Sequence, residues 1–83
     1  MSKATFLLFI SGENTTRSKS AINNIKRRLK TENYNLMIID ILENPQVAEL
    51  VGIVATPLLM RTIPKPVRRF VGDFTDSKLD ILT

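Results

Sequence analysis

The 83-residue chain contains no cysteine and no histidine. The absence of cysteine excludes disulfides, thiol redox chemistry and a cysteine nucleophile, and the further absence of histidine removes the usual zinc ligands. Histidine is also the side chain most often used as a general base near neutral pH. The acidic residues are scattered and form no DxD or ExxE cluster for magnesium. We therefore expect a protein that is not an enzyme and needs no metal or cofactor.

Long hydrophobic runs are also missing. No apolar stretch approaches the roughly 20 residues of a membrane helix. The run Thr5–Ile10 follows Lys3 but is too short for a signal peptide, and no small-residue cleavage site follows it. The composition, 43% hydrophobic and 24% charged, is typical of a soluble globular protein. We expect one cytoplasmic domain over residues 1–83, with no membrane contact.

The net charge of +4 is unevenly distributed. Two blocks carry basic residues without acids: Arg17, Lys19, Lys26, Arg27, Arg28 and Lys30 in the first, and Arg61, Lys65, Arg68 and Arg69 in the second. This asymmetry favours an anionic partner, either nucleic acid or an acidic protein face. A solvated helix face with a protected strand edge explains it equally well. Only Tyr34 is near the first block as a stacking aromatic, which disfavours nucleic acid.

The first half of the chain predicts a strand, a helix and a second strand. Thr5–Ile10 is continuously apolar, as in a central strand buried on both faces. A turn at 11–16 offers several N-cap candidates, and apolar residues then recur at helical spacing from Ala21 to Leu29. Leu36–Ile41 is a second doubly apolar strand. We therefore expect a right-handed βαβ unit.

The second half begins with a short helix. Asparagine is favoured at the N-cap and proline at the first helical position, so Asn44 and Pro45 start this helix. Gly52 suits the left-handed residue that ends it. Residues Leu58–Ile63, directly after Thr56-Pro57, are predicted to form a third strand.

The C-terminal part shows no dominant period. If Val67–Val71 is a strand, Phe70 lies on the face opposite Val67 and Val71; if it is a helix, the three residues lie on one side of the helix. The tail fits either a short helix starting at Thr75 or Asp76, or an edge strand at 80–83. Both choices stay open.

Five further side chains have an expected place. Aromatic residues near apolar runs usually bury, so we place the four phenylalanines, Phe6, Phe9, Phe70 and Phe74, in the core. Asp40, at the end of the second strand, either caps the next turn or pairs with a basic side chain.

The predicted order of elements resembles a thioredoxin-type domain. In that fold a cis-proline stands before the third strand, where this chain has Thr56-Pro57. The redox centre, Cys-x-x-Cys, follows the first strand, where this chain has Gly12–Thr16 without cysteine. The resemblance implies a thioredoxin scaffold without thioredoxin chemistry.

Three motifs make the resemblance more specific. Ile39–Glu49, Ala55–Leu59 and Pro64–Asp76, in this order and spacing, closely resemble the KaiB family of circadian clock proteins. The likeness covers nearly the whole chain. Kinase sensor domains related to KaiB share the Ala-Thr-Pro motif but usually lack a Pro-Val-Arg-Arg run, so they rank second.

The KaiB resemblance implies a non-enzymatic clock adaptor. It would bind a KaiC-type ATPase ring, modulate the phosphorylation state of that ring, and then capture a KaiA-type protein or displace a sensor kinase. Family members interconvert between a thioredoxin-like monomer, βαβ-αββ(α), and a ground-state fold, βαββααβ, that self-associates as a dimer or tetramer. The C-terminal half rearranges, which is also where no period prevails.

The family's functional positions carry over residue by residue. Positions that match the partner-binding surface are Asn44, Pro45, Gln46, Ala48, Glu49, Arg61, Arg68 and Arg69. Pro57, Pro64 and Pro66 match the cis-proline and hinge positions, and Gly72 and Asp73 match the fold-switch region.

Some positions depart from the family pattern. Glu43 and Gly52 stand where lysine is frequent, and Ser20 where arginine is usual. The family also continues beyond Asp76 with a longer apolar helix and an acidic tail. These differences predict a divergent KaiB. An anionic-ligand or nucleic-acid module on the same scaffold is the alternative of a different class, and it rests on charge alone.

Overall fold

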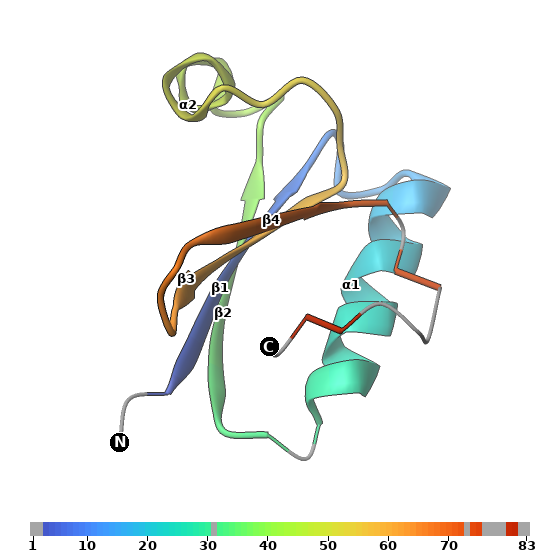
Figure 1. Cartoon of the computed structure of the whole chain (residues 1–83). Helices are drawn as coiled ribbons and strands as arrows, with labels where there is room; N and C mark the ends of the chain where they lie inside the picture. The colour runs from blue at the N-terminus through green and yellow to red at the C-terminus, as the bar shows by residue number, and fades with distance from the viewer. Residues whose placement is uncertain (1–2, 31, 73, 76–79, 82–83) are drawn as a thin grey trace.

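The computed structural model describes residues 3–30, 32–72, 74–75 and 80–81, and it contains four strands and two helices among them (Figure 1). In chain order the elements are β1 (Ala4–Ile10), α1 (Thr16–Leu29), β2 (Tyr34–Asp40), α2 (Pro45–Val51), β3 (Leu58–Ile63) and β4 (Arg68–Val71). This order confirms the predicted βαβ-αββ arrangement. The alternative ground-state order is not the one that this structure adopts.

The four strands form one sheet in the order β2-β1-β3-β4. Strand β1 is parallel to β2 and antiparallel to β3, and β3 is antiparallel to β4. The central position predicted for the first strand is therefore correct. The second strand is apolar on both faces like the first, but it is not buried on both faces. It lies at the edge of the sheet, and Met37 and Ile38 are 60% and 38% exposed. A strand with apolar residues on both faces buries them only where both faces are covered, and β2 is covered incompletely.

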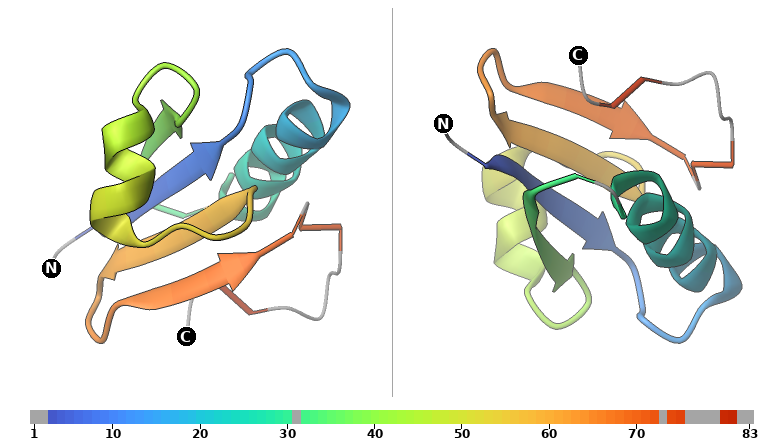
Figure 2. Two further views of the ribbon diagram at one scale, coloured as in Figure 1. Left: turned by 90° about the horizontal axis from the view of Figure 1, so that it is seen from above. Right: turned by 90° about the horizontal axis from the view of Figure 1, so that it is seen from below.

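The two helices lie on opposite sides of this sheet (Figures 1 and 2). Helix α1 runs along one face, and the larger apolar cluster, which includes Phe6, Leu8, Ile25 and Leu59, fills the space between them. Helix α2 lies against the other face near one end of the strands. A smaller cluster around Phe9, Leu58 and Met60 packs there. The placement of the four phenylalanines is confirmed, since none is more than 7% exposed.

The ambiguous segment at residues 67–71 forms a strand. Within β4, Phe70 is buried and its neighbours Arg69 and Val71 are exposed, which is the two-residue alternation of a half-buried strand. Most of the tail lies outside the described residues, so neither tail prediction is tested beyond Asp80 and Ile81, which are neither helix nor strand. Across the described part of the chain, no helix has the length and apolar character needed to cross a membrane.

Thr15 caps the N-terminus of α1. Its extended backbone and its side-chain oxygen, which accepts a hydrogen bond from the Ser18 N–H at 3.2 Å, satisfy one of the free donors of the first turn. We expect Thr15→Ala to lower the free energy of unfolding by about 1 kcal/mol. Urea denaturation measures this, with Thr16→Ala as the control, because Thr16 is the first helical residue and not the N-cap. Equal losses in both variants would contradict the assignment.

Candidate functional site

The turn after β1 meets the start of β3 at a shallow hollow of about 290 Å³. The Thr56-Pro57 peptide bond is cis and Pro57 is buried, as the thioredoxin resemblance implied. Most residues that line the hollow carry hydroxyl groups, in the place where a thioredoxin has its thiols. The lining residues are Ser11, Thr15, Thr16, Arg17, Ser18, Thr56 and Pro57. No group in this lining can perform thiol exchange, so the hollow cannot carry out thioredoxin chemistry.

The turn after β2 is organised by Asp40. Its carboxylate accepts hydrogen bonds from three backbone N–H groups: Gly12 and Leu42 at 3.0 Å each, and Glu13 at 3.2 Å. One side chain thereby joins the loop after β1 to the turn that leads into α2. The prediction that Asp40 caps the next turn is confirmed. The Asn44 side chain, by contrast, makes no cap bond to α2 and instead donates to the Asp40 carbonyl at 3.1 Å.

These hydrogen bonds hold the pKa of Asp40 below its ordinary value of 3.8. The Gly12 N–H is the largest cause, the Leu42 N–H follows, and burial opposes them more strongly than the Glu13 N–H supports them. Because the folded pKa is depressed, the ionised carboxylate stabilises the fold above pH 3.8. This stabilisation is lost as the pH falls below 3.8 through the folded pKa.

We expect Asp40→Asn to unfold at lower urea concentration than the wild type at pH 7, because its amide nitrogen cannot accept from a backbone N–H. The gap between the two proteins should narrow as the pH falls below 3.8. Urea denaturation from pH 7 to pH 2 measures this gap. Glu43→Gln removes one exposed carboxylate from the following turn and is the matched control. A gap that stays constant with pH would contradict the role of the Asp40 charge.

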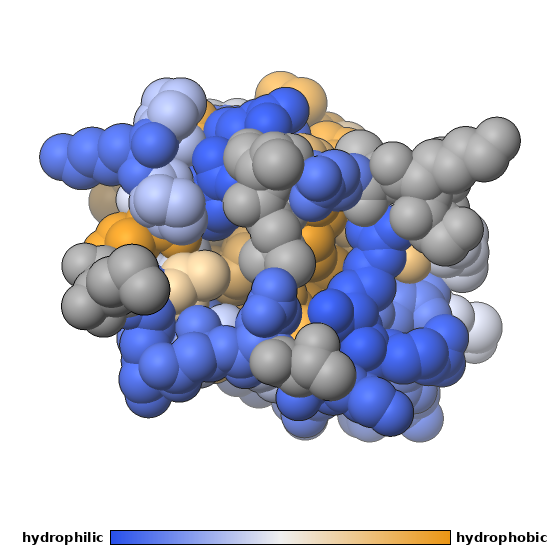
Figure 3. Space-filling view, turned by 60° about the horizontal axis from the view of Figure 1, so that its bottom comes forward, coloured by the Kyte–Doolittle hydropathy of each residue, from blue (hydrophilic) through white to orange (hydrophobic). Residues whose placement is uncertain are grey.

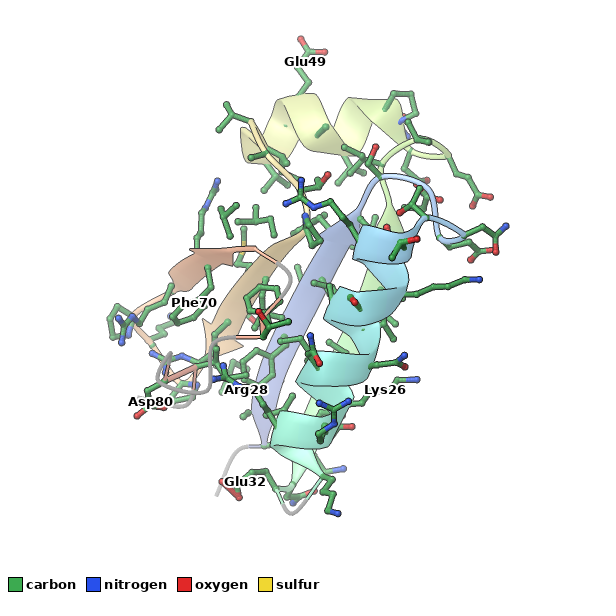
Figure 4. All side chains as sticks on the ribbon, turned by 90° about the vertical axis from the view of Figure 1, so that its right-hand side faces the viewer. Lys26, Arg28, Glu32, Glu49, Phe70 and Asp80 are labelled. Atoms are coloured by element: carbon green, nitrogen blue, oxygen red, sulfur yellow. The ribbon has the colours of Figure 1, made fainter. Side chains whose placement is uncertain are left out.

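Helix α2 has one packed side and one open side. Val47, Val51 and, just beyond the helix, Ile53 contact the smaller apolar cluster. Gly52 ends the helix in the left-handed conformation that was predicted, with a φ of 75°. On the open side, Glu49 points away from the body of the protein (Figure 4).

The open side of α2 and its flanking loops is unusually apolar. Leu42, Leu50 and Val54 are 67%, 83% and 99% exposed. We call this set the α2 surface: Leu42, Leu50 and Val54 together with the predicted partner-binding residues Asn44, Pro45, Gln46, Ala48 and Glu49. Exposed apolar groups gathered with polar ones are typical of protein interaction sites. The partner-binding role of the five predicted residues stays a prediction, and the three exposed apolar residues were not among the predicted positions.

Arg69 fastens the C-terminal end of α2 to the sheet. Its Nη2 donates to the Val51 carbonyl at 2.7 Å and its Nη1 to the Gly52 carbonyl at 3.3 Å. The last turn of α2 has no basic residue of its own. Arg69, from β4, supplies the positive charge that the carbonyl end of a helix favours. The structure thus brings the Arg69 side chain to the C-terminal end of α2, beside the α2 surface.

Arg61 and Arg68 lie on the other face of the sheet. Arg61 is only 2% exposed, so the surface position expected for it beside α2 is wrong in this fold. Its strand partner is Phe6, whose side chain belongs to the cluster under α1. Arg68 shares that face: its guanidinium lies over the Phe70 ring, 5.4 Å from the centroid. The alternation of β3 and β4 therefore divides the three predicted arginines between two faces.

The remaining predicted positions lie in the β3–β4 turn and after β4. Pro64 and Pro66 are exposed and both follow cis peptide bonds, as does Pro57. Gly72 has a φ of 135° and donates its N–H to the Pro57 carbonyl at 3.1 Å. Asp73 lies outside the described residues. The hinge and fold-switch roles of these residues stay predictions.

Comparison with known proteins agrees with the motifs. The family model described as the KaiB domain matches residues 7–83. The chain belongs to the KaiB family. The "Circadian clock oscillator protein KaiB" of Parasynechococcus marenigrum is 44% identical to it over 72 residues, covering 83% of this chain and 68% of that protein. The "Circadian clock protein KaiB3" of Synechocystis sp. is 39% identical over 85 residues, covering 99% and 82%. Coverage of the curated KaiB relatives falls as low as 60% of their length.

Solved structures place this KaiB homologue in the thioredoxin-like class. The N-terminal domain of Synechococcus elongatus SasA matches with a TM-score of 0.74 at 22% identity, over 88% of this chain and 71% of that one. Mitochondrial thioredoxin 3 of Saccharomyces cerevisiae matches with a TM-score of 0.71 at 12% identity, over 88% and 70%. At these identities the matches show the fold alone. The predicted thioredoxin-like KaiB fold is confirmed.

Proposed function

We propose that this KaiB homologue is a non-enzymatic clock adaptor that binds a KaiC-type ATPase ring through the α2 surface and thereby modulates the phosphorylation state of the ring. A KaiA-type protein or a sensor kinase would be its further partner, in the cytoplasm. Membership of the KaiB family supports the biological context. The observation that carries the proposal is the cluster of exposed apolar side chains on and beside α2.

The α2 surface has the composition of a docking site. Leu50 and Val54 expose two aliphatic side chains almost completely, and such groups contribute binding free energy when a partner removes them from water. Glu49 and Gln46 surround them with polar groups that can form a rim. The hydrogen bonds of Arg69 and the packing of Val47 and Val51 attach α2 to the sheet. A rigid docking element loses little conformational entropy on binding.

The proposal includes a second fold with a homo-oligomeric state. Residues 67–71 support it, because their sequence is compatible with both a strand and a helix and the structure realises only the strand. Two packings of one sequence can differ by only a few kcal/mol. An NMR amide fingerprint recorded alongside sedimentation velocity tests this part. Slowly exchanging doubled peaks with an oligomeric species are expected, and one monomeric set of peaks would contradict the second fold without affecting the binding proposal.

Co-sedimentation with a KaiC-type ATPase ring tests the binding proposal. The full chain is mixed with the ring in its ATP-bound and ADP-bound states, and we expect it to sediment with the ring in at least one of them. A duplex DNA titration at 50 and 200 mM salt is the counter-test. Absence of ring binding in both states, together with DNA binding that weakens steeply with salt, would replace the adaptor with a nucleic-acid module.

A further inference from the structure

Arg61 is a buried cation with unused hydrogen-bond donors. Its residue is 2% exposed, and among the described residues its Nε and Nη1 groups have no acceptor. Its Nη2 makes a single long bond of 3.4 Å to the Pro66 carbonyl. Within that part of the chain no carboxylate forms an ion pair or hydrogen bond with it. Burying a charge without a hydrogen-bonded counter-charge is costly, so such an arginine requires an anion.

The surroundings of Arg61 add positive charge. Its cross-strand neighbour on β4 is Arg68, and like charges directly opposite each other in a sheet destabilise it. From the other side, Arg28 extends from α1 toward this part of the sheet (Figure 4). Arg61 and Arg68 are therefore neighbours on the face of the sheet that α1 covers. With the bottom of the molecule turned forward, hydrophilic side chains cover most of the visible surface, and hydrophobic atoms show between them and at its edges (Figure 3).

We propose that Arg61 and Arg68 form an oxyanion-binding site on the α1 face of the β3–β4 turn. The site takes one carboxylate or phosphate group, which accepts hydrogen bonds from the unused N–H groups of Arg61. Guanidinium groups bind both kinds of oxyanion through short, charge-assisted hydrogen bonds. This site lies on the face of the sheet opposite the α2 surface and is independent of the function proposed for that surface.

Two sources can supply the oxyanion. One is the C-terminal segment of this chain, because Ile81 is buried in the same cluster as Phe6, the strand partner of Arg61. Asp80, next to Ile81, lies on the same side of the sheet as Phe70 (Figure 4). The other source is a free anion such as inorganic phosphate. The chemistry at Arg61 is the same in both cases, and two experiments distinguish them.

The first experiment is a thermal denaturation of the full chain in increasing inorganic phosphate, at constant ionic strength. A ligand that binds only the folded state raises the melting temperature in a saturable way. With a free anion as the source, the melting temperature of the wild type should rise by roughly 4 to 8 °C, and that of Arg61→Met should not change. Arg27→Met removes the same charge from an exposed position of α1 and should respond to phosphate like the wild type.

The second experiment is a double-mutant cycle between Arg61→Met and Asp80→Asn. With the C-terminal segment as the source, phosphate has no effect on the wild type. Asp80→Asn then lowers the melting temperature of the wild type by several degrees but leaves that of Arg61→Met unchanged. Arg61→Lys keeps the positive charge, so its coupling energy with the bound anion should be smaller than that of the wild type but not zero. This variant replaces Arg61→Met in the cycle if Arg61→Met does not fold.

The two experiments also define the result that overturns the proposal. If phosphate does not stabilise the wild type, and if Asp80→Asn costs the same in the wild type and in Arg61→Met, then Arg61 binds no oxyanion. The same holds if phosphate stabilises Arg61→Met as much as the wild type, because the bound phosphate would then lie elsewhere on the protein.

Discussion

Phe6→Ala is expected to lower the free energy of unfolding by about 3–5 kcal/mol. Phe6 lies in the central strand β1, is fully buried and contacts the cluster that joins the sheet to α1. Replacing it removes a large apolar area and leaves a cavity that this close-packed cluster cannot refill. A domain of this size has a total stability of roughly 5–15 kcal/mol, so the variant should be partly unfolded at 37 °C.

Urea denaturation followed by circular dichroism measures this loss. Leu50→Ala is the matched control, because it also truncates a large apolar side chain, but one that is 83% exposed. The control should change the free energy of unfolding by no more than about 0.5 kcal/mol. A loss below about 1 kcal/mol for Phe6→Ala would mean that α1 and the sheet do not share the compact core described above.

Leu50→Asp is expected to weaken binding to a KaiC-type ATPase ring by roughly 30-fold or more, which corresponds to about 2 kcal/mol or more. Leu50 is the large apolar residue of α2 whose side chain is most exposed, at 83%. A carboxylate in its place would be dehydrated against an apolar partner surface, at a cost added to the loss of the aliphatic contact. The fold should be unaffected, because the side chain makes few contacts in the free protein.

Equilibrium sedimentation or fluorescence anisotropy with the ring measures this affinity. Val67→Asp is the matched control: Val67 is 53% exposed, but it lies in the β3–β4 turn, at the end of β3 away from α2. It should bind within about twofold of the wild type if its position makes no contact with the partner. Equal affinity of Leu50→Asp and Val67→Asp would exclude the α2 surface as the binding site.

Features with local causes could be predicted from the sequence. Thr5–Ile10 as a strand, Gly52 as a helix end and the third strand at Leu58–Ile63 each depend on a few neighbouring residues, and all three were correct. Whether residues 67–71 form a strand or a helix could not be decided without the tertiary structure, because their apolar residues fit both periods equally. Packing of Phe70 beneath α1 decided between them.

Features with long-range causes could not be predicted from the pattern. Strand β2 has the same apolar character as β1, and its place at the edge depends on the strand order alone. The guanidinium of Arg69 reaches carbonyls 17 and 18 residues earlier in the chain. Arg61 was assigned to the partner-binding surface by the family resemblance, and its burial follows from the pairing of β3 with β1. Leu50 follows the apolar pattern of α2 and Val54 lies beyond the end of the helix, so the exposure of both, 83% and 99%, also depended on the fold.

The hydrogen bonds between Arg69 and α2 make the α2 surface depend on the pairing of β4 with β3. The guanidinium that fastens the end of the helix comes from the strand at the far edge of the sheet, so it is in place only while β4 is paired with β3. Any event that withdraws β4 from the sheet also frees the end of α2 and changes the surface there. The affinity of a partner that binds α2 therefore depends on whether β4, at the other edge of the sheet, is formed.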